Sequence, residues 1–397
     1  MDYIFSDKIS SVKPSAIREI FKFTADPSVI PFAAGNPSAL SFPAQKMDEI
    51  SSELFKNQAG KALQYSITEG YPVLRGQVID RLKKRLGFSD TSDSLVITSG
   101  GQQGLDLTCK ILCNEGDTVI CENPSFIGAL NAFRAYNVNL VGVDMENDGM
   151  NIEKLENALK TNKNVKFIYL IPTFQNPMGI TMSPEKRKAV YALAIKYDVL
   201  ILEDDPYGEL RFSGQDILPI KSLDTCGRVI YVSSFSKILS AGMRIGYLFA
   251  NSKITEKIVV AKQVNDVHTN IFFQMLCSEF IIRHGLDGHI ADIKSLYKQK
   301  SALMLSKMDE CFDKKISYTR PEGGLFLWCC LPVGYDAFEF SKICISNKIA
   351  IVPGNAFLAN ESQKSNAFRL NYSTPSDEQI KNGIETLAKL ISDYIKV

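Results

Sequence analysis

The feature that most constrains the fold is an alternation of two sequence patterns between residues 94 and 250. Short runs rich in β-branched residues alternate there with longer segments of helical period, which is typical of a sheet whose strands are joined by crossover helices. One connecting segment has a clear helix start, with Ser183 as N-cap followed by Pro184 and Glu185. We therefore predict an α/β domain with a mostly parallel seven-stranded sheet covered by helices. The predicted strands span residues 95–98, 118–121, 140–143, 166–171, 199–202, 229–232 and 245–250.

The sequence changes in character after residue 285, and a chain of 397 residues is too long for one simple core. A long mixed helix ending near Cys311 is followed by a hairpin-like segment over residues 316–331. Apolar residues at helical spacing then predict a closing helix that begins at Thr374 and Pro375. The expected parts are an N-terminal arm that packs with the small domain and the substrate site (residues 1–45), a large domain (46–285) and a smaller α+β domain (286–397).

Charge and composition exclude several classes of partner. Forty-five basic and 44 acidic residues give a formal net charge of +1, which offers no field for nucleic acid or an anionic membrane. The first residues show no basic start before an apolar core, and no apolar run approaches the roughly 18 residues that span a bilayer. The nine cysteines show no CxxC spacing. We expect reduced thiols in a cytoplasmic protein, no metal site, and a small neutral or acidic substrate.

The most specific motif of the chain is Ser-Ser-Phe-Ser-Lys at residues 233–237, at the exit of a β-rich run. Lys237 could place its amine at an aldehyde, while Ser234, Ser236 and Arg244 hold a phosphate group. For a single lysine, the alternative is a solvated side chain in a serine-rich loop. The other motifs of the chain favour the chemical interpretation.

A second motif, Glu-Asp-Asp-Pro-Tyr at residues 203–207, follows the predicted strand 199–202 at its carboxyl end, where open α/β sheets bind ligands. A carboxylate here could pair with the pyridine nitrogen of pyridoxal 5'-phosphate (PLP) and keep it protonated, so that the ring withdraws electrons from a substrate Cα. Tyr207, which follows Asp204 by three residues, could donate to the phenolate oxygen of the ring. The alternative is an acidic turn that caps the next segment, and the motif alone favours neither.

Three further segments could complete such a site. Asn176 lies in a loop after the predicted strand 166–171 and could give a second hydrogen bond to the phenolate. The turn at residues 98–103 leads into a helix predicted to start near Leu105, and free backbone amides there could bind phosphate. Phe126 could lie flat on the cofactor ring. Taken alone, each segment also fits an ordinary loop, turn or core residue.

Arg369 lies between apolar neighbours in a short predicted strand, Phe-Arg-Leu-Asn-Tyr at residues 368–372. A buried arginine needs a partner, and its planar fork suits the carboxylate that every amino acid carries. The alternative is an edge arginine in water. The glycines at residues 100 and 101 do not match GxGxxG, and GxxxxGK[ST] is absent, so neither a dinucleotide nor a nucleoside triphosphate is indicated.

Because these motifs follow one another in the same order, the chain resembles the PLP-dependent aminotransferases of the aspartate aminotransferase fold. Among them, it resembles the branch of 2-aminoadipate, aromatic and kynurenine aminotransferases. The resemblance spans almost the whole chain. It implies the PLP-dependent transferase fold and a homodimer with shared active sites. The segments that carry it are Ala16-Ile17-Arg18-Glu19, Phe32-Ala33-Ala34-Gly35, Leu63-Gln64-Tyr65-Ser66, Glu69-Gly70-Tyr71, Gly100-Gly101-Gln102-Gln103, Gln175-Asn176-Pro177, Glu203-Asp204-Asp205, the Lys237 motif, Thr319-Arg320-Pro321-Glu322-Gly323-Gly324 and Val352-Pro353-Gly354.

The resemblance implies a role for each matching position. Lys237 would form the Schiff base with PLP, and Asp204 would pair with the pyridine nitrogen. Tyr207 and Asn176 would hold the phenolate oxygen, and Arg369 would bind the α-carboxylate of the substrate. The remaining cofactor-binding positions are Phe126, which would stack on the ring, and Gly101, Gln102, Ser234, Ser236, Arg244 and, from the neighbouring subunit, Tyr65, which would hold the phosphate.

The resemblance also implies the reaction and its substrates. An amino group would pass by a ping-pong mechanism between glutamate and 2-oxoglutarate as one pair and 2-aminoadipate, kynurenine or an aromatic amino acid as the other. Arg18, in the Ile-Arg-Glu segment, would bind a second carboxylate on the substrate, although a solvated arginine is the alternative. Gly35 and Asn176 are further expected substrate contacts. In place of the Gly-Gly-Leu-Pro of many relatives, residues 34–37 read Ala-Gly-Asn-Pro.

Two other functions remain open at this stage. A PLP-dependent lyase or decarboxylase could use the same residues, because the reaction depends on which Cα bond stands perpendicular to the ring. Bacterial transcription regulators carry a very similar domain as a PLP-binding sensor, but they need a winged-helix module ahead of it, and the matching segment here starts at about residue 15. We expect an aminotransferase of amino acid biosynthesis.

Overall fold

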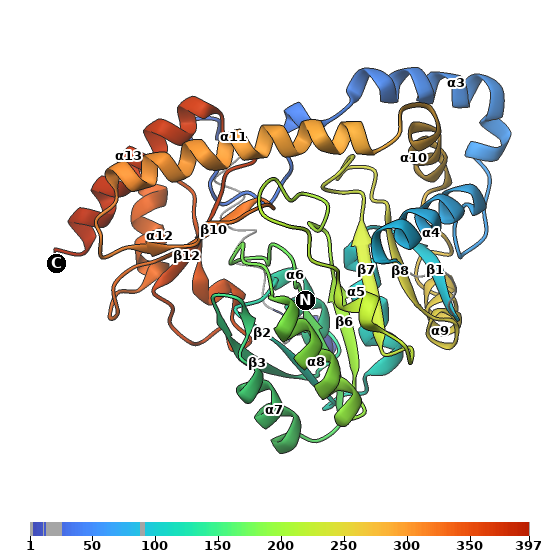
Figure 1. The fold of residues 1–397 in the computed structure, drawn as a ribbon, viewed down its shortest axis with the longest axis horizontal. Coiled ribbons are helices and arrows are strands. Elements are labelled where there is room, and N and C mark those ends of the chain that lie inside the picture. Colours follow the sequence, from blue (N-terminus) through green and yellow to red (C-terminus); the bar gives the residue numbers. More distant parts are fainter. Residues whose placement is uncertain (1–2, 11, 13–25, 88–91, 397) are drawn as a thin grey trace.

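The computed structural model describes residues 3–10, 12, 26–87 and 92–396 of the chain (Figure 1). Its strands form one sheet of eight strands and one of four. The helices are α1 (Asp7–Ser10), α3 (Ala44–Ala62), α4 (Pro72–Leu86), α5 (Gly101–Leu112), α6 (Ile127–Arg134), α7 (Ile152–Thr161), α8 (Pro184–Lys196), α9 (Ser252–Gln263), α10 (Ile271–His284), α11 (Asp287–Cys311), α12 (Ala337–Ser346) and α13 (Asp377–Tyr394), with 3-10 turns η1 (Ala39–Ser41), η2 (Ile220–Leu223) and η3 (Gly354–Phe357). The strands are β1 (Asp93–Thr98), β2 (Thr118–Asn123), β3 (Asn139–Glu146), β4 (Gly149–Met150), β5 (Val165–Leu170), β6 (Leu200–Asp204), β7 (Val229–Ser234), β8 (Gly246–Asn251), β9 (Ser317–Tyr318), β10 (Phe326–Cys330), β11 (Val352–Pro353) and β12 (Ala367–Asn371).

The large sheet contains all the predicted strands and one that the sequence did not predict, the two-residue β4. Its strand order is β1-β8-β7-β6-β5-β2-β3-β4. Strands β3, β2, β5, β6 and β7 run parallel, whereas β8 is antiparallel to both of its neighbours and β4 is antiparallel to β3. The prediction of a mostly parallel α/β sheet is confirmed, with eight strands in place of seven.

Both faces of the large sheet are buried, as alternate residues of β5 show. Phe167 and Tyr169 belong to one hydrophobic core together with Leu105 of α5. Ile168, between them, belongs to a second core together with Val190 of α8. Successive side chains of a strand point to opposite faces, so the two cores lie on opposite sides of the sheet. This burial on both faces explains why the strands read as continuous apolar runs.

The predicted start of α8 agrees with the structure, whereas the predicted start of α13 does not. Ser183 caps α8 as predicted, with its hydroxyl accepting a hydrogen bond from a backbone amide of the first turn. Helix α13 begins at Asp377 rather than at Thr374, so that prediction is wrong by one turn. The reason is a capping box in which Ser376 and Gln379 satisfy each other's backbone amides.

The small sheet is antiparallel, with the order β11-β12-β10-β9. Figure 1 shows α11 running from the helices around the large sheet to the small sheet, with α13 beside it. The arm meets this part of the chain, because Ile30 forms a β-bridge with Ile349 and the Asn371 amide donates to the Phe32 carbonyl at 2.8 Å. The division at residues 45 and 285 stays a prediction. None of the helices in the described ranges combines the length and the hydropathy needed to cross a membrane.

Candidate active site

A cavity of about 380 Å³ opens where β5, β6 and β7 end. These are carboxyl ends of parallel strands, the edge at which open α/β sheets bind ligands. Of the predicted site residues that the structure describes, all except Tyr65 line this cavity. They are Gly35, Gly101, Gln102, Phe126, Asn176, Asp204, Tyr207, Ser234, Ser236, Lys237, Arg244 and Arg369.

Lys237 follows β7 and brings a primary amine to the cavity. Its Nζ donates a hydrogen bond to the Gly35 carbonyl oxygen at 2.8 Å. Burial, together with the positive charges of Arg369 and Arg244, lowers the pKa of Lys237 to about 8. A lysine with a lowered pKa is a better nucleophile and base near neutral pH.

The three consecutive acids Glu203, Asp204 and Asp205 are all buried but have different surroundings. Asp204 lines the cavity, and its Oδ2 accepts a hydrogen bond from the Tyr169 hydroxyl at 3.0 Å. Glu203 accepts two backbone N–H bonds from the η2 turn. Asp205 accepts a hydrogen bond from the Tyr231 hydroxyl at 2.6 Å. Of the three carboxylates, Asp204 is therefore the one that lies at the cavity.

The charge state of Asp204 depends on what occupies the cavity. Burial raises the pKa of Asp204 to about 7, the hydrogen bond from Tyr169 lowers it, and the charge of Asp205 raises it again. A cationic group next to Asp204 would favour the ionised form. This carboxylate is therefore suited to pair with a protonated ring nitrogen.

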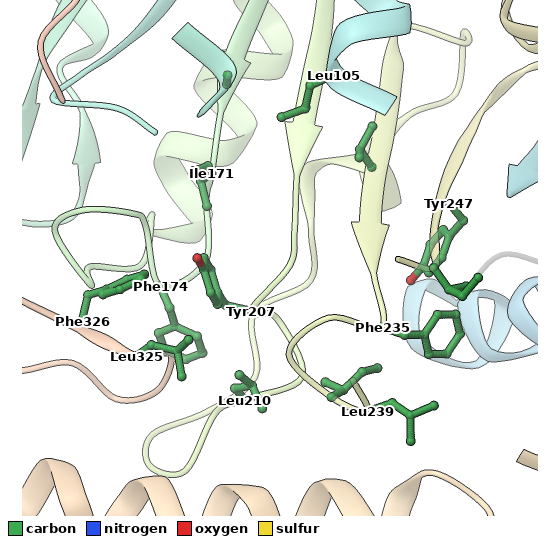
Figure 2. Packing of buried hydrophobic residues seen from close by; sticks show 14 of the residues in the cluster. Leu105, Ile171, Phe174, Tyr207, Leu210, Phe235, Leu239, Tyr247, Leu325 and Phe326 are labelled. Carbon is green, nitrogen blue, oxygen red and sulfur yellow. The ribbon is translucent and has the colours of Figure 1, made fainter. Parts of the chain in front are cut away.

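Tyr207, Asn176 and Arg369 form a polar chain along one wall of the cavity. Asn176 forms a hydrogen bond with the Tyr207 hydroxyl, and its Oδ1 accepts one from Arg369 Nη1 at 2.8 Å. The Tyr207 ring packs edge-on against Phe326, with centroids 5.8 Å apart. Figure 2 shows the Tyr207 hydroxyl directed toward Ile171, which also lines the cavity. A phenol and an amide thus lie side by side at the cavity, where a phenolate oxygen could accept from both.

Arg369 lies in β12, between β11 and β10, so it is a buried arginine and not an edge arginine in water. Its Nη2 donates to the Ala33 carbonyl oxygen at 2.9 Å, and its guanidinium carbon lies 4.2 Å from the centre of the Phe326 ring. Its buried Nε has no hydrogen-bond partner within the described part of the chain. Burial lowers the pKa of Arg369 to about 10. A buried cation with an unused donor is suited to bind a carboxylate.

The turn before α5 corrects the prediction that this helix starts near Leu105. The helix begins at Gly101, no side chain caps it, and Gly101 and Gln102 of its first turn line the cavity, so an anion there could bind at the helix start. Gly100 has a φ of +81°, and a Cβ there would lie 2.3 Å from the Arg244 guanidinium. Only glycine therefore allows Arg244 to lie against this turn. The other predicted phosphate ligands at the same cavity are Gln102, Ser234 and Ser236.

A partly buried polar cluster around Lys262, which the sequence did not reveal, holds the same turn. Lys262 Nζ donates to Gln103 Oε1 at 2.7 Å and to Thr269 Oγ1 at 2.9 Å. Lys262 Nζ also contacts both carboxylate oxygens of Asp266, at 2.9 and 3.0 Å. The Ser99 hydroxyl donates to Asp266 Oδ2 at 2.8 Å. The Lys262 side chain is fully buried in helix α9, whose sequence carries no motif that would have indicated this role.

One predicted site residue of the described ranges, Tyr65, lies elsewhere. Tyr65 is outside the cavity, in the loop after α3, with 81% of its surface exposed and its ring edge-on to His268 at 5.8 Å. Arg18 falls outside the described residues.

The sheet topology and the cavity lining are those expected of a PLP-dependent enzyme of the aspartate aminotransferase fold, and known proteins of this class are similar to the whole chain. Aromatic-amino-acid aminotransferase 1 of Thermococcus litoralis is 39% identical over 402 residues, which cover 100% of this chain and 96% of that protein. Two crystal structures are also similar, and each match covers 99% of this chain and 98% of the chain in the crystal structure. Kynurenine aminotransferase of Pyrococcus horikoshii, in complex with PMP, has a TM-score of 0.95 at 39% identity. LysN, the α-aminoadipate aminotransferase of Thermus thermophilus, complexed with N-(5'-phosphopyridoxyl)-L-leucine, has a TM-score of 0.91 at 32% identity.

Residues 27–387 match the family described as aminotransferase class I and II, and the chain belongs to this family. It is a PLP-dependent aminotransferase. The residues present fit the cofactor on their own chemistry. The cavity combines an amine of lowered pKa, a buried carboxylate, a phenol beside an amide, and an uncapped helix start next to an arginine.

Proposed function

We propose that this aminotransferase binds PLP through Lys237 and Asp204 and exchanges amino groups between two pairs of amino acid and oxo acid in this one cavity. The observation that carries the proposal is that Lys237 shares the cavity with Asp204 and Arg369. When bound, PLP supplies an aldehyde that bonds to an amino nitrogen and a ring that draws electrons from the substrate Cα.

Each step then has a residue of this chain that performs it. Arg369 binds the α-carboxylate of the amino acid and so holds Cα beside Lys237. Lys237 Nζ would accept the proton that leaves Cα and deliver it to the C4′ atom of the bound cofactor, and its pKa of about 8 suits both the uptake and the release of this proton. Asp204 holds the proton on the ring nitrogen, and Tyr207 and Asn176 donate to the phenolate oxygen. The same residues serve the second oxo acid in reverse, which gives ping-pong kinetics.

The remaining residues hold the cofactor in place. We propose that the first amides of α5 and the side chain of Arg244 bind the phosphate, because both lie at the same end of the cavity. Phe126, the residue before α6, would stack on the ring. The other proposed phosphate ligands are Gly101, Gln102, Ser234 and Ser236, with Tyr65 from a second subunit.

For substrates, we propose glutamate and 2-oxoglutarate as one pair and a longer or aromatic amino acid as the other. The names of the relatives, which include aromatic amino acids, kynurenine and α-aminoadipate, support the choice of the second pair. Phe126 and Ile127 add apolar surface to the cavity, which suits such side chains. Gly35 and Asn176 are the further proposed substrate contacts. Arg18 remains a candidate for a side-chain carboxylate on sequence grounds alone.

We further propose a homodimer with shared active sites that works in the cytoplasm in amino acid biosynthesis. Exposed apolar side chains around Tyr65 support the dimer, since such a patch is typical of an interface. They include Ile67 and Val73, which line one surface pocket together with Tyr65. The relatives named above are aminotransferases, which favours transamination over the lyase, decarboxylase and sensor alternatives.

The reaction is tested by giving the PLP-loaded protein a panel of amino acids and 2-oxoglutarate and quantifying every product. We expect one glutamate for each oxo acid formed from 2-aminoadipate, kynurenine or phenylalanine. Release of carbon dioxide or of a β-substituent without glutamate would instead identify a decarboxylase or a lyase.

Shared sites are tested by mixing Lys237→Ala protomers with Tyr65→Phe protomers. If Tyr65 serves the neighbouring subunit, the hybrid dimer contains one site with both residues intact and recovers activity. Proven subunit exchange without recovery would show that Tyr65 acts in its own subunit.

A further inference from the structure

Strand β6 lies between two strands that each present one buried tyrosine to an acid, one to Asp204 at the end of β6 and the other to Asp205 directly after it. Tyr169 of β5 donates to Asp204 at 3.0 Å, and Tyr231 of β7 donates to Asp205 at 2.6 Å. All four side chains are buried. The two pairs are chemically alike, but only Asp204 lines the cavity. The fold therefore contains a functional pair and a natural control for it.

Strand register explains why each tyrosine meets its own acid. Tyr169 lies opposite Leu202, and Tyr231 lies opposite Glu203. Side chains two residues apart on a strand share a face, so Asp204 shares a face with Leu202, and Asp205 would share one with Glu203. Each tyrosine therefore extends toward the acid that lies two residues beyond its register partner.

We propose that Tyr169 is a positioning residue, which orients the Asp204 carboxylate in the cavity and keeps the shared proton on the ring nitrogen of bound cofactor rather than on Asp204. The inference rests on the proposed pairing of Asp204 with that nitrogen. A hydrogen bond donated to one carboxylate oxygen stabilises the ionised carboxylate and leaves its other oxygen for the ring.

The groups around Asp204 give this hydrogen bond its importance. Burial and the charge of Asp205 raise the pKa of Asp204, and the hydrogen bond from Tyr169 lowers it. Glu122 of β2 and Tyr207 also interact electrostatically with Asp204, and neither is a cation. The Tyr169 ring itself is fixed by an edge-on contact with Phe133, with centroids 5.3 Å apart. Tyr169 is thus a rigidly held donor in surroundings that otherwise disfavour the carboxylate.

The experiment loads wild type, Tyr169→Phe and Tyr231→Phe with PLP labelled with ¹⁵N in the ring and records the ring nitrogen resonance, which reports protonation directly. A hydrogen bond to a charged group corresponds to about a ten- to hundredfold change in a proton equilibrium. In Tyr169→Phe, we expect the ring nitrogen resonance to shift toward the value of the unprotonated ring. The shift should correspond to a change of that order in the protonation equilibrium between the ring nitrogen and Asp204. Tyr231→Phe should keep the wild-type resonance, even though thermal unfolding should show that both variants lose stability.

A wild-type resonance in Tyr169→Phe, or an equal shift in Tyr231→Phe, would overturn the inference. Asp204→Asn separates it from the function proposed above. If Asp204→Asn moves the resonance and Tyr169→Phe does not, the pairing of Asp204 survives and only the role of Tyr169 fails. In the Asp204→Asn background, adding Tyr169→Phe should change nothing further, and a shift that persists there would show that Tyr169 acts through another group.

Discussion

Arg369 and Asn176 are joined by a hydrogen bond of 2.8 Å that crosses between the small sheet and the loop after β5 of the large sheet. The two residues are 193 positions apart in sequence. Arg369 therefore contacts the side-chain amide of Asn176, which we propose to hold the cofactor. It also donates a hydrogen bond to the carbonyl oxygen of Ala33 in the N-terminal arm. Through this contact, the substrate binding that we propose for Arg369 would be coupled to the position of Asn176.

The first prediction concerns Arg369→Lys, which keeps the charge but loses the planar fork. We expect kcat/KM to fall by about ten- to hundredfold for every amino acid, because one charge-assisted hydrogen bond to the common α-carboxylate is lost. The measurement is steady-state kinetics with an aromatic and an acidic donor. Arg320→Lys is the control, because Arg320 lies between β9 and β10, outside the cavity lining, with its side chain 57% exposed. A loss confined to one donor would assign Arg369 to side-chain recognition.

The second prediction separates two adjacent acids. Asp204→Asn should still bind PLP but slow Cα proton removal severely, because a neutral amide cannot hold the ring proton. Asp205→Asn should do much less, since Asp205 does not line the cavity. Single-turnover rates with a Cα-deuterated donor measure this step directly. Equal rates in Asp204→Asn and wild type would remove Asp204 from its proposed role.

The third prediction tests the cluster around Lys262, which holds the turn before α5 where we propose that the phosphate binds. Lys262→Met should raise the Kd of PLP by about tenfold or more, which corresponds to ~1.4 kcal/mol, because Asp266 loses its ion-pair partner and Gln103, whose Oε1 accepts from the Ser99 amide, loses the hydrogen bond from Lys262. Fluorescence titration of the apoprotein with PLP measures the Kd. Lys300→Met is the matched control, a buried lysine of α11 that lies outside the cavity lining. The same loss of PLP affinity in both variants would mean that any buried lysine supports binding through overall stability.

The fourth prediction concerns the pH dependence of stability. Burial raises the pKa of Glu122 from 4.5 to about 8, although hydrogen bonds from Gln175 and the Ile171 amide lower it. The folded protein therefore holds this proton more tightly than the unfolded chain does. Relative to Glu122→Gln, wild type should lose up to a few kcal/mol of unfolding free energy as the pH rises from about 4.5 to about 8. Urea unfolding of both proteins across this range tests the sign, and a constant difference would contradict it.

The parts of the fold that sequence predicted well are those where one local pattern decides the structure. The apolar runs became strands because both faces of the large sheet are covered, and Ser183 caps α8 because its hydroxyl satisfies a free amide. The two-residue β4 carries no such pattern and exists only because it pairs with the end of β3. The start of α5 at Gly101 was missed because glycine is a poor helix former, and the surrounding turn sets the start instead.

The same reasoning divides the residues of the site. Lys237 and Asp204 stand in polar motifs at strand ends and could be predicted from them. Tyr169 could not, because it lies inside the run Lys-Phe-Ile-Tyr-Leu-Ile, where a tyrosine reads as one more core side chain. Lys262 reads as an ordinary lysine of an amphipathic helix. Their partners come from distant segments, so only the assembled fold reveals the hydrogen bonds.

The central claim is that Lys237 forms the covalent bond to PLP. The most direct measurement is borohydride reduction of the PLP-loaded protein, followed by peptide mass spectrometry of wild type and Lys237→Ala. The account predicts that phosphopyridoxyl is found on Lys237 in wild type, and that the folded Lys237→Ala protein binds PLP without a covalent adduct and has almost no turnover. A phosphopyridoxyl adduct on another lysine of folded Lys237→Ala, with turnover retained, would contradict it.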